Sequence, residues 1–373
     1  RISEVAGELD SLDWIATHLA SQETSRHLAW ITGWTTDPTG ETLETALREA
    51  DIPGVVEITE PPSDKAPPSV LRNPRWARPF ELFVKLLGVP GRGETDPTGV
   101  VAVAAPLMFG YMFGDVGQGA VLAILGALLR KKLPALGLLL PGGIAAMVFG
   151  VLFGHVFAME GIVPALWLHP IEEPLAVLVP PMVFGAGLIL LGLLLNAVSA
   201  GWQGQLARWA RADAGFLLFY LGGLGTVFWT PMAVLALAGG LWFVAGEALG
   251  PPGAPRRRSP LVALPGAIGT FAEEALRAVV NTISFVRVGA FALAHSGLAL
   301  AVVTLAEPAN PIGAAVILIV GNIAIIALEG LVVSVQTSRL ILFEFFIRFL
   351  RAGGRVFSPT VPPACVVPGT DRG

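Results

Sequence analysis

The chain has 373 residues, of which 54% are hydrophobic and 14% are charged, and its mean hydropathy is +0.69. Soluble globular proteins carry roughly 25% charged residues, so this composition excludes a single soluble domain. The net charge of −4 and the lack of a broad basic face exclude a nucleic-acid-binding protein. The single cysteine, Cys365, excludes an internal disulfide and a cysteine-based metal site.

The first 79 residues are predicted to form the end of a soluble arm. Apolar residues recur at intervals of three and four over residues 1–22, which predicts an amphipathic helix and is compatible with a coiled coil. After it we expect two short strands over residues 27–34 and 54–59, flanking a helix over residues 41–50. The proline-rich stretch that follows cannot hold a regular helix or strand, so it is predicted to be a linker into the membrane.

Six long segments of low charge follow the linker. They cover residues 98–129, 135–157, 174–200, 213–249, 274–306 and 312–350. A bilayer core about 30 Å thick is crossed by about 20 helical residues. The fourth segment would run about 55 Å as one helix, so we expect Thr230-Pro231 to divide it into two helices. The first segment is interrupted by GDVGQG at residues 114–119, and both one tilted helix and a pair of short helices are compatible with it.

Four basic clusters decide between these two possibilities. They are Arg130-Lys131-Lys132, Arg208 with Arg211, Arg256-Arg257-Arg258, and Arg348 with Arg351 and Arg355. Basic residues concentrate on the cytoplasmic side of membrane proteins. If the first segment is a hairpin that turns at Asp115, the chain crosses eight times and all four clusters lie on the side of the soluble front end. A single crossing would place the three internal clusters opposite it, so we expect the hairpin.

The expected fold is therefore an all-α polytopic membrane protein with about eight transmembrane helices, preceded by a small α/β remnant. The expected domains are residues 1–79, a membrane domain of residues 80–358 and a tail of residues 359–373. The last two apolar segments are longer than a perpendicular crossing needs, so both are predicted to be strongly tilted.

Ionisable residues inside the spanning segments are the strongest functional signal. Arg287 and His295 share one expected helix, and Glu329 and Arg339 share the next. Asp115 lies in the first hairpin. Placing such residues in the membrane costs a few kcal/mol on insertion scales, and they commonly mark ion pathways. The alternative is that each arginine pairs with a carboxylate and only locks helices together.

Four sequence blocks resemble one known family, the large membrane stator subunit of rotary V-type and A-type ATPases, called subunit a in eukaryotes and subunit I in bacteria and archaea. The blocks are PLMFGYMFGDVGQG at 106–119, NTISFVRVGAFALAH at 281–295, ALEGLVVSVQTSRLILFEFFIRF at 327–349 and GGRVFSP at 353–359. The resemblance extends from about residue 28 to residue 358. Members have a much longer cytoplasmic arm, and this chain begins at Arg1 without a methionine or a signal peptide, so we expect an N-terminally truncated member.

The resemblance implies roles for the two arginines. Arg287 is similar to the essential stator arginine of the penultimate helix, and Arg339 is similar to its partner on the last helix. The family often has a histidine where this chain has Gln336, and a tyrosine where it has Val286. The glutamine weakens any expectation of a proton relay at that position, although it can still form hydrogen bonds.

The resemblance also implies two aqueous half-channels, and the direction of the chain assigns polar residues to each. The helix of Arg287 runs from inside to outside and the helix of Arg339 runs back. The outer set is Asp115, His295 and Glu329, and the inner set is Glu273, Asn281 and Ser284. The subunit would couple translocation of H⁺ or Na⁺ to rotation, with no cofactor and no catalytic site of its own, since the sequence contains no nucleotide-binding motif.

The partners that the resemblance implies are a rotor ring of proteolipid subunits, a peripheral stalk, other V/A-type ATPase subunits and membrane lipid, with no nucleic acid. The chain would be a multi-pass protein of a prokaryotic cell membrane, with its N-terminal part in the cytoplasm.

A secondary ion-coupled transporter is the alternative function. It predicts matching inverted halves, which the sequence lacks, because both arginines lie in the last quarter. A purely structural membrane anchor does not explain two membrane arginines with a histidine and a glutamate.

Overall fold

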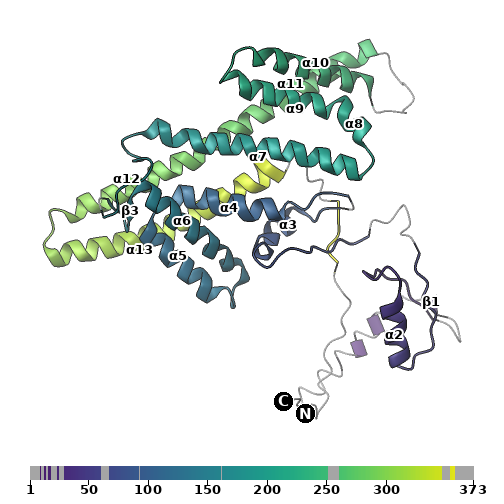
Figure 1. Ribbon diagram of the computed structural model, residues 1–373. Coiled ribbons are helices and arrows are strands. Elements are labelled where there is room, and N and C mark those ends of the chain that lie inside the picture. Colours follow the sequence, from purple (N-terminus) through teal and green to yellow (C-terminus); the bar gives the residue numbers. More distant parts are fainter. Residues whose placement is uncertain are drawn as a thin grey trace. The chain divides into compact units, whose positions relative to one another are not determined.

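The computed structural model describes residues 9, 12–13, 16–17, 23–24, 29–59, 67–91, 93–160, 162–250, 260–346 and 353–357. The chain divides into two compact units (Figure 1). One consists of Arg1–Val70 with Gly354–Gly373, and the other consists of Leu71–Gly353. Most of the helix expected over residues 1–22, the basic cluster at 256–258 and the basic residues at 348 and 351 lie outside the described residues.

The described residues of the first unit contain little regular structure. Strands β1 (Glu23–Thr24) and β2 (Ala29–Trp30) pair in antiparallel fashion, and α2 (Glu41–Glu49) confirms the predicted helix. The strand predicted over residues 54–59 is wrong, because these residues are irregular. The side chains of Val56 and Ile58 pack near Gly40 at the start of α2, and no described strand lies alongside to form a ladder.

The chain entering α2 is held by one carboxylate. Both oxygens of Asp37 accept hydrogen bonds, from the N–H and hydroxyl groups of Thr39 and Thr42. These bonds, led by the one from the Thr42 hydroxyl, hold the pKa of Asp37 well below its usual range.

The second unit is mostly helical. Its elements are η1 (Arg78–Phe80), α3 (Glu81–Leu87), α4 (Thr98–Phe113), α5 (Val116–Leu129), η2 (Pro134–Leu138), α6 (Leu139–Phe153), β3 (His155–Val156), β4 (Met159–Glu160), α7 (Pro174–Trp202), α8 (Leu206–Arg211), α9 (Asp213–Thr226), α10 (Met232–Leu249), α11 (Pro260–Ser284), α12 (Val286–Ala306), α13 (Pro311–Arg339) and the π-helix η3 (Leu340–Phe345). The only strands described in this unit are β3 and β4, which form a hairpin.

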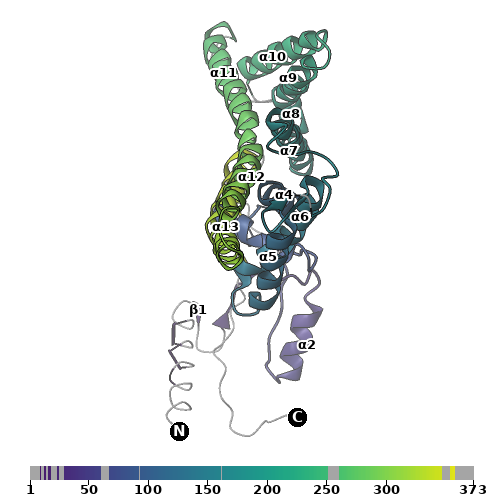
Figure 2. The same ribbon diagram turned by 90° about the vertical axis from the view of Figure 1, so that its left-hand side faces the viewer.

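The helices of this unit form two layers, which are separated clearly in Figure 2. α11, α12 and α13 make one layer, and α4 to α10 make the other. Between the layers, α12 packs on α4 and α7, α13 packs on α4, and α11 packs on α10. Within the second layer, α5 pairs with α6 and α9 pairs with α10. The expected division of both long segments is confirmed, because α4 ends before Asp115 and the α9–α10 turn contains Pro231.

Five helical stretches are long and apolar enough to cross a membrane. They are Ala135–Phe153, Pro174–Trp202, Met232–Leu249, Val262–Ala306 and Pro311–Phe345. α4 and α5 are apolar but shorter, with 16 and 14 residues. At 1.5 Å per residue they extend about 24 and 21 Å, less than the core of a typical bilayer. The expected count of eight crossings therefore stays a prediction.

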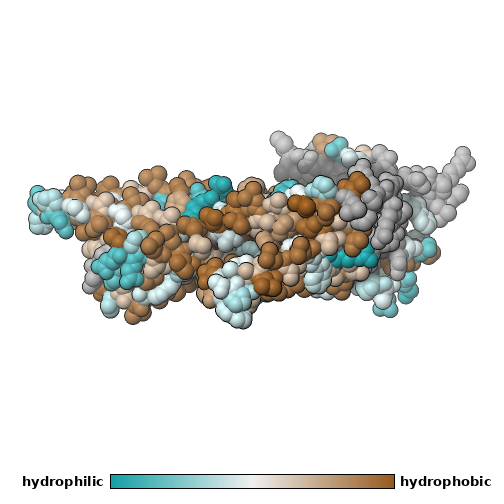
Figure 3. All heavy atoms as spheres, turned by 90° about the horizontal axis from the view of Figure 1, so that it is seen from above, coloured by the Kyte–Doolittle hydropathy of each residue, from teal (hydrophilic) through white to brown (hydrophobic). Residues whose placement is uncertain are grey.

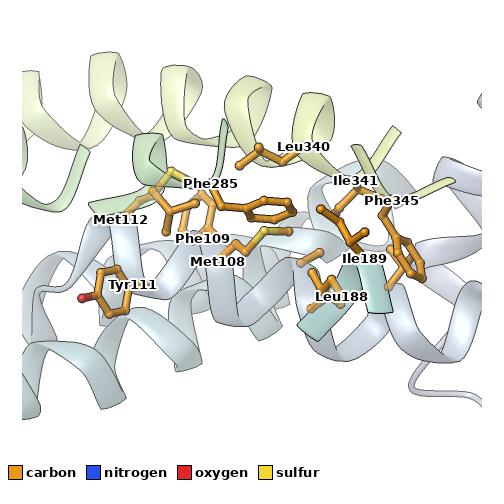
Figure 4. Packing of buried hydrophobic residues seen from close by; sticks show 14 of the residues in the cluster. Met108, Phe109, Tyr111, Met112, Leu188, Ile189, Phe285, Leu340, Ile341 and Phe345 are labelled. Carbon is orange, nitrogen blue, oxygen red and sulfur yellow. The ribbon is translucent and has the colours of Figure 1, made fainter. Parts of the chain in front are cut away.

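Both long C-terminal helical stretches contain an irregular turn. The helical stretch from 260 to 306 breaks at Phe285, and the last helix changes to π-helical geometry after Arg339. Phe285 is 1% exposed, and its ring occupies the space next to Gly185 of α7. Figure 4 shows this ring among Met108 and Phe109 of α4 and Leu340 of η3. The break thus lies where the two layers pack together.

One buried hydroxyl compensates for a proline in α7. Pro181 lacks an N–H group, so the carbonyl of Val177, four residues earlier, loses its helical partner. The hydroxyl of Tyr111 on α4 donates to that carbonyl at 2.8 Å. The bond satisfies a buried acceptor and ties α4 to α7.

The outward surface of the helices is largely apolar. In the view of Figure 3, hydrophobic residues cover most of the described surface, with smaller hydrophilic patches between them. On α13, the exposed large apolar residues include Leu328, Leu331 and Val335. Such a surface is suited to lipid or to other membrane helices.

Candidate functional site

Both intramembrane arginines lie at irregularities in their helices. Arg287 is in the first turn of α12, directly after the break at Phe285. Arg339 is the last residue of α13, and the π-helix η3 follows it immediately. π-helical turns are rare and are frequently found at functional sites. Each arginine therefore lies next to an irregular turn in the α11–α13 layer.

An open pocket of about 600 Å³ brings the two arginines together. Its lining residues come from the end of α11, the start of α12, Arg339 and η3: Val280, Asn281, Ile283, Ser284, Val286, Arg287, Arg339, Phe343 and Glu344. Arg287 is half-buried, whereas Arg339 is exposed. Four of the site residues predicted from the sequence, Arg287, Arg339, Asn281 and Ser284, therefore surround one space.

Arg287 is only partly paired. Its Nη2 donates to the hydroxyl of Ser284 at 3.2 Å. Its Nη1 is buried and has no hydrogen-bond partner among the described residues, and the same holds for Nδ2 of Asn281. A guanidinium carries five N–H donors and a permanent charge. The pocket therefore keeps unused donors and positive charge that an anion can satisfy.

Glu344 is a functional candidate that the sequence analysis missed. Its Oε1 accepts a 2.8 Å bond from the Ser284 hydroxyl, which in turn accepts from Arg287. The side chain is 6% exposed, and its Oε2 has no partner in the described part of the chain. In a regular α-helix, a residue five positions after Arg339 would lie about 140° around the axis from it. The π-helical turn, with its i→i+5 bonding, brings Glu344 back to the same side.

A second polar pair lies farther along the same two helices. Nδ1 of His295 on α12 and Oε2 of Glu329 on α13 are 2.7 Å apart, and both side chains are buried. The ring of Phe113 lies 5.1 Å from the imidazole. Nε2 of His295 and Oε1 of Glu329 have no hydrogen-bond partner within the described ranges. Eight and ten residues separate this pair from the arginines, or about 12 and 15 Å along the helices.

A third polar group surrounds Asp115. Its side chain is fully buried. It caps α5 by accepting from Gln118 N at 2.8 Å, and it accepts from the N–H groups of Phe157 and Ala158 at 3.0 and 2.8 Å. The amide of Gln118 donates to Oδ1 of Asn322 on α13 at 2.8 Å. Gln118 and Asn322 were not among the predicted site residues, although each is a polar residue within an apolar run.

Two further predicted site residues, besides His295, Glu329 and Asp115, lie outside the arginine pocket. Glu273 is 68% exposed and pairs with Arg277 one turn later on α11, at 2.6 Å. Gln336 is half-buried on α13, and its Oε1 has no partner among the residues that the structure describes. Neither residue lines the pocket. The ion-translocation roles predicted for these residues stay predictions.

Comparison with known proteins shows what this chain is similar to. Residues 15–156 match the model of the V-type ATPase 116kDa subunit family. The chain is 29% identical over 336 residues to A-type ATP synthase subunit I of Pyrococcus horikoshii, an alignment that covers 82% of this chain and 49% of the relative. It is 27% identical to the protein of that name from Thermococcus kodakarensis, covering 88% of this chain and 53% of the relative. It is 26% identical to A-type ATP synthase subunit I of Methanocaldococcus jannaschii, an alignment that covers 89% of this chain and 54% of the relative.

The chain thus spans about half the length of the curated relatives that it matches. The family model covers α4, α5, α6 and the β3 strand, and therefore includes Asp115.

Proposed function

Because these comparisons support identification of the chain as the large membrane subunit of the V-type and A-type ATPases, we propose that it is the membrane stator of such a rotary complex. In this role it provides two ion half-channels and presents Arg287 and Arg339 to the rotor ring. It couples translocation of H⁺ or Na⁺ to rotation. ATP chemistry belongs to other subunits of the complex.

The observation that carries the proposal is the shared pocket of Arg287 and Arg339, which is open to the surface and flanked by exposed apolar residues. A rotor carboxylate that faces lipid must be neutral, by protonation or by a bound Na⁺, because a bare charge there is costly. Opposite two arginines the same carboxylate is stabilised as an anion and releases its ion. Since arginine does not deprotonate, it also blocks direct passage of protons between the two half-channels.

The two polar regions beside the pocket supply the half-channels in this proposal. Chain direction places the inner set, Glu273, Asn281 and Ser284, before Arg287 and towards the cytoplasm. The same argument assigns the outer set, Asp115, His295 and Glu329, to the side away from the cytoplasm. Gln336 lies between Glu329 and Arg339 on α13. The direct contact between His295 and Glu329 supports one continuous outer region, and the open pocket at Asn281 and Ser284 supports access from the inner side.

In this proposal, each exposed part of the chain has a partner. The rotor ring of proteolipid subunits packs against the α11–α13 layer, lipid covers the remaining apolar surface, and a peripheral stalk holds the soluble arm on the cytoplasmic side. We place the chain in a prokaryotic cell membrane, in line with its archaeal relatives.

The decisive experiment removes the charge of Arg287. In the complete complex reconstituted into vesicles, we expect Arg287→Ala to abolish ATP-driven ion pumping while subunit assembly stays intact. Arg287→Lys should not restore normal pumping, because lysine lacks the planar guanidinium and can lose its proton when buried. Arg208→Ala is the matched control, since Arg208 is exposed on α8, away from the pocket. Normal pumping by Arg287→Ala would refute the proposal.

A secondary transporter remains the competing function, and a flux measurement on the purified chain separates the two. A transporter would move its ion without ATP hydrolysis and without rotor subunits. Ion uptake by the purified chain alone, driven only by a gradient, would favour that alternative.

A further inference from the structure

The β3–β4 hairpin, which contacts Asp115, has an unusual turn. β3 and β4 are joined by two residues, Phe157 and Ala158, and both have positive φ, of 50° and 66°. A two-residue turn with both residues in the left-handed region is a type I′ turn, which favours Asn and Gly. Phenylalanine and alanine are poor residues for this backbone, because the Cβ atom crowds the carbonyl. The hairpin therefore needs support from outside.

Asp115 supplies that support. Its Oδ1 accepts the N–H groups of Phe157 and Gln118, and its Oδ2 accepts the N–H group of Ala158. Successive N–H groups of a turn commonly converge on an anion in this way. Both carboxylate oxygens are thus occupied by backbone donors, in a site with no solvent exposure.

The hairpin in turn contacts α13. The carbonyl of Phe157 accepts a 3.2 Å bond from Nδ2 of Asn322, and Oδ1 of Asn322 accepts the 2.8 Å bond from Gln118. Gln118 lies in the first turn of α5, which Asp115 caps. Asn322 is seven residues, about two helical turns, before Glu329 and lies on the same buried face of α13.

We propose that, within the outer set, Asp115 is a positioning residue, whereas ion exchange belongs to His295 and Glu329. The Asp115 carboxylate holds the strained turn at Phe157 and Ala158, and that turn, with Gln118, fixes Asn322 and therefore the register of α13. The register places Glu329 against His295. This inference rests on the proposed function for the importance of Glu329, but the role of the carboxylate in holding the turn does not depend on it.

The test compares three changes in the complete complex. Asp115→Asn keeps an oxygen acceptor and removes the ionisable group, so ion flux should remain at half of wild type or more. Asp115→Ala removes all three hydrogen bonds, and flux should fall below one tenth. Adding Ala158→Gly to Asp115→Ala should raise flux severalfold, because glycine adopts the turn without support. The same glycine should not restore flux to Glu329→Gln, which serves as the matched control.

Hydrogen exchange of residues 155–160 gives a readout that is independent of pumping. We expect fast exchange of the Phe157 and Ala158 amides in Asp115→Ala, whereas in Asp115→Asn the amide that faces the remaining side-chain oxygen should stay slower. The proposal is overturned if Asp115→Asn loses flux as completely as Glu329→Gln while these amides stay protected. If Arg287→Ala and Glu329→Gln pump normally, the proposed function fails, whereas the exchange data still report on the turn.

Discussion

The ring of Phe285, at the break between α11 and α12, packs directly against the backbone of Gly185 in α7. A Cβ atom on Gly185 would lie 2.1 Å from Cγ of Phe285, closer than any real contact allows. Arg287 follows two residues after Phe285. The position of Arg287 therefore depends on a glycine that lies about 100 residues earlier in the chain.

We expect Gly185→Val to disturb both stability and pumping. The added side chain must displace the Phe285 ring, and such overpacking costs about 1–3 kcal/mol. Because the ring sits at the helix break, Arg287 should shift with it and ATP-driven flux should fall. Gly187→Ala is the matched control, since a Cβ there meets no atom within 4 Å. Thermal unfolding and flux of both variants check the prediction, and an unchanged Gly185→Val would contradict it.

The contact between His295 and Glu329 has two interpretations that substitution separates. Glu329→Gln keeps the shape and most of the hydrogen bonding but removes the charge. If Glu329 exchanges ions, this variant should slow pumping with near-normal assembly. If the pair only fixes packing, Gln should be tolerated, whereas Glu329→Leu should destabilise the protein by about 1–3 kcal/mol, because it leaves His295 without a partner.

We expect the first outcome, measured as proton flux and complex assembly for both variants. Glu307→Gln, at the exposed turn between α12 and α13, is the control for loss of an outer carboxylate. Full flux in Glu329→Gln would remove Glu329 from the ion path.

Glu344 offers the arginine pocket a counter-charge within the subunit. Glu344→Gln keeps an acceptor for the Ser284 hydroxyl but leaves both arginines without a nearby anion. A rotor carboxylate should then be held more strongly, because Coulomb attraction in a partly buried site is several times stronger than in water. We expect slower turnover at saturating ATP, by severalfold, with no added passive leak.

Glu247→Gln, at the exposed end of α10, controls for the loss of a carboxylate elsewhere. Single-molecule rotation and vesicle flux measure the effect. Turnover of Glu344→Gln equal to that of wild type would show that the counter-charge is unimportant.

The predicted orientation is open to a direct labelling test. In a background in which Cys365 is replaced by serine, Lys131→Cys should react with a membrane-impermeant maleimide only from the cytoplasmic side. Glu172→Cys, in the loop between α6 and α7, should react only from the outside. Both side chains are exposed, so each should react readily. Reaction of Lys131→Cys only from the outside and of Glu172→Cys only from the cytoplasmic side would contradict the hairpin at Asp115, and reaction of both from the same side would contradict a crossing by α6.

The class of this protein and the charged residues of its apolar helices can be predicted from the amino-acid sequence alone. Apolar runs with few charged residues indicate spanning helices, because hydropathy is a local property that needs no knowledge of contacts. The divisions at Asp115 and Pro231 were predictable for the same reason, since capping and proline geometry act within one turn. Arg287, Arg339, His295 and Glu329 stood out because a charged or titratable side chain is rare inside an apolar helix.

How these residues meet depends on contacts between segments that are distant in the chain. The break at Phe285 depends on space beside Gly185, and the place of Glu344 in the pocket depends on a π-helical turn that a regular 3.6-residue period does not predict. The strand predicted over residues 54–59 failed because a strand needs a neighbour. Asp115 stood out in the sequence as an acid in a membrane hairpin, but its three donors include two from a turn some 40 residues later. Local patterns identify such groups, whereas their partners are set by the packing of segments that lie far apart in the chain.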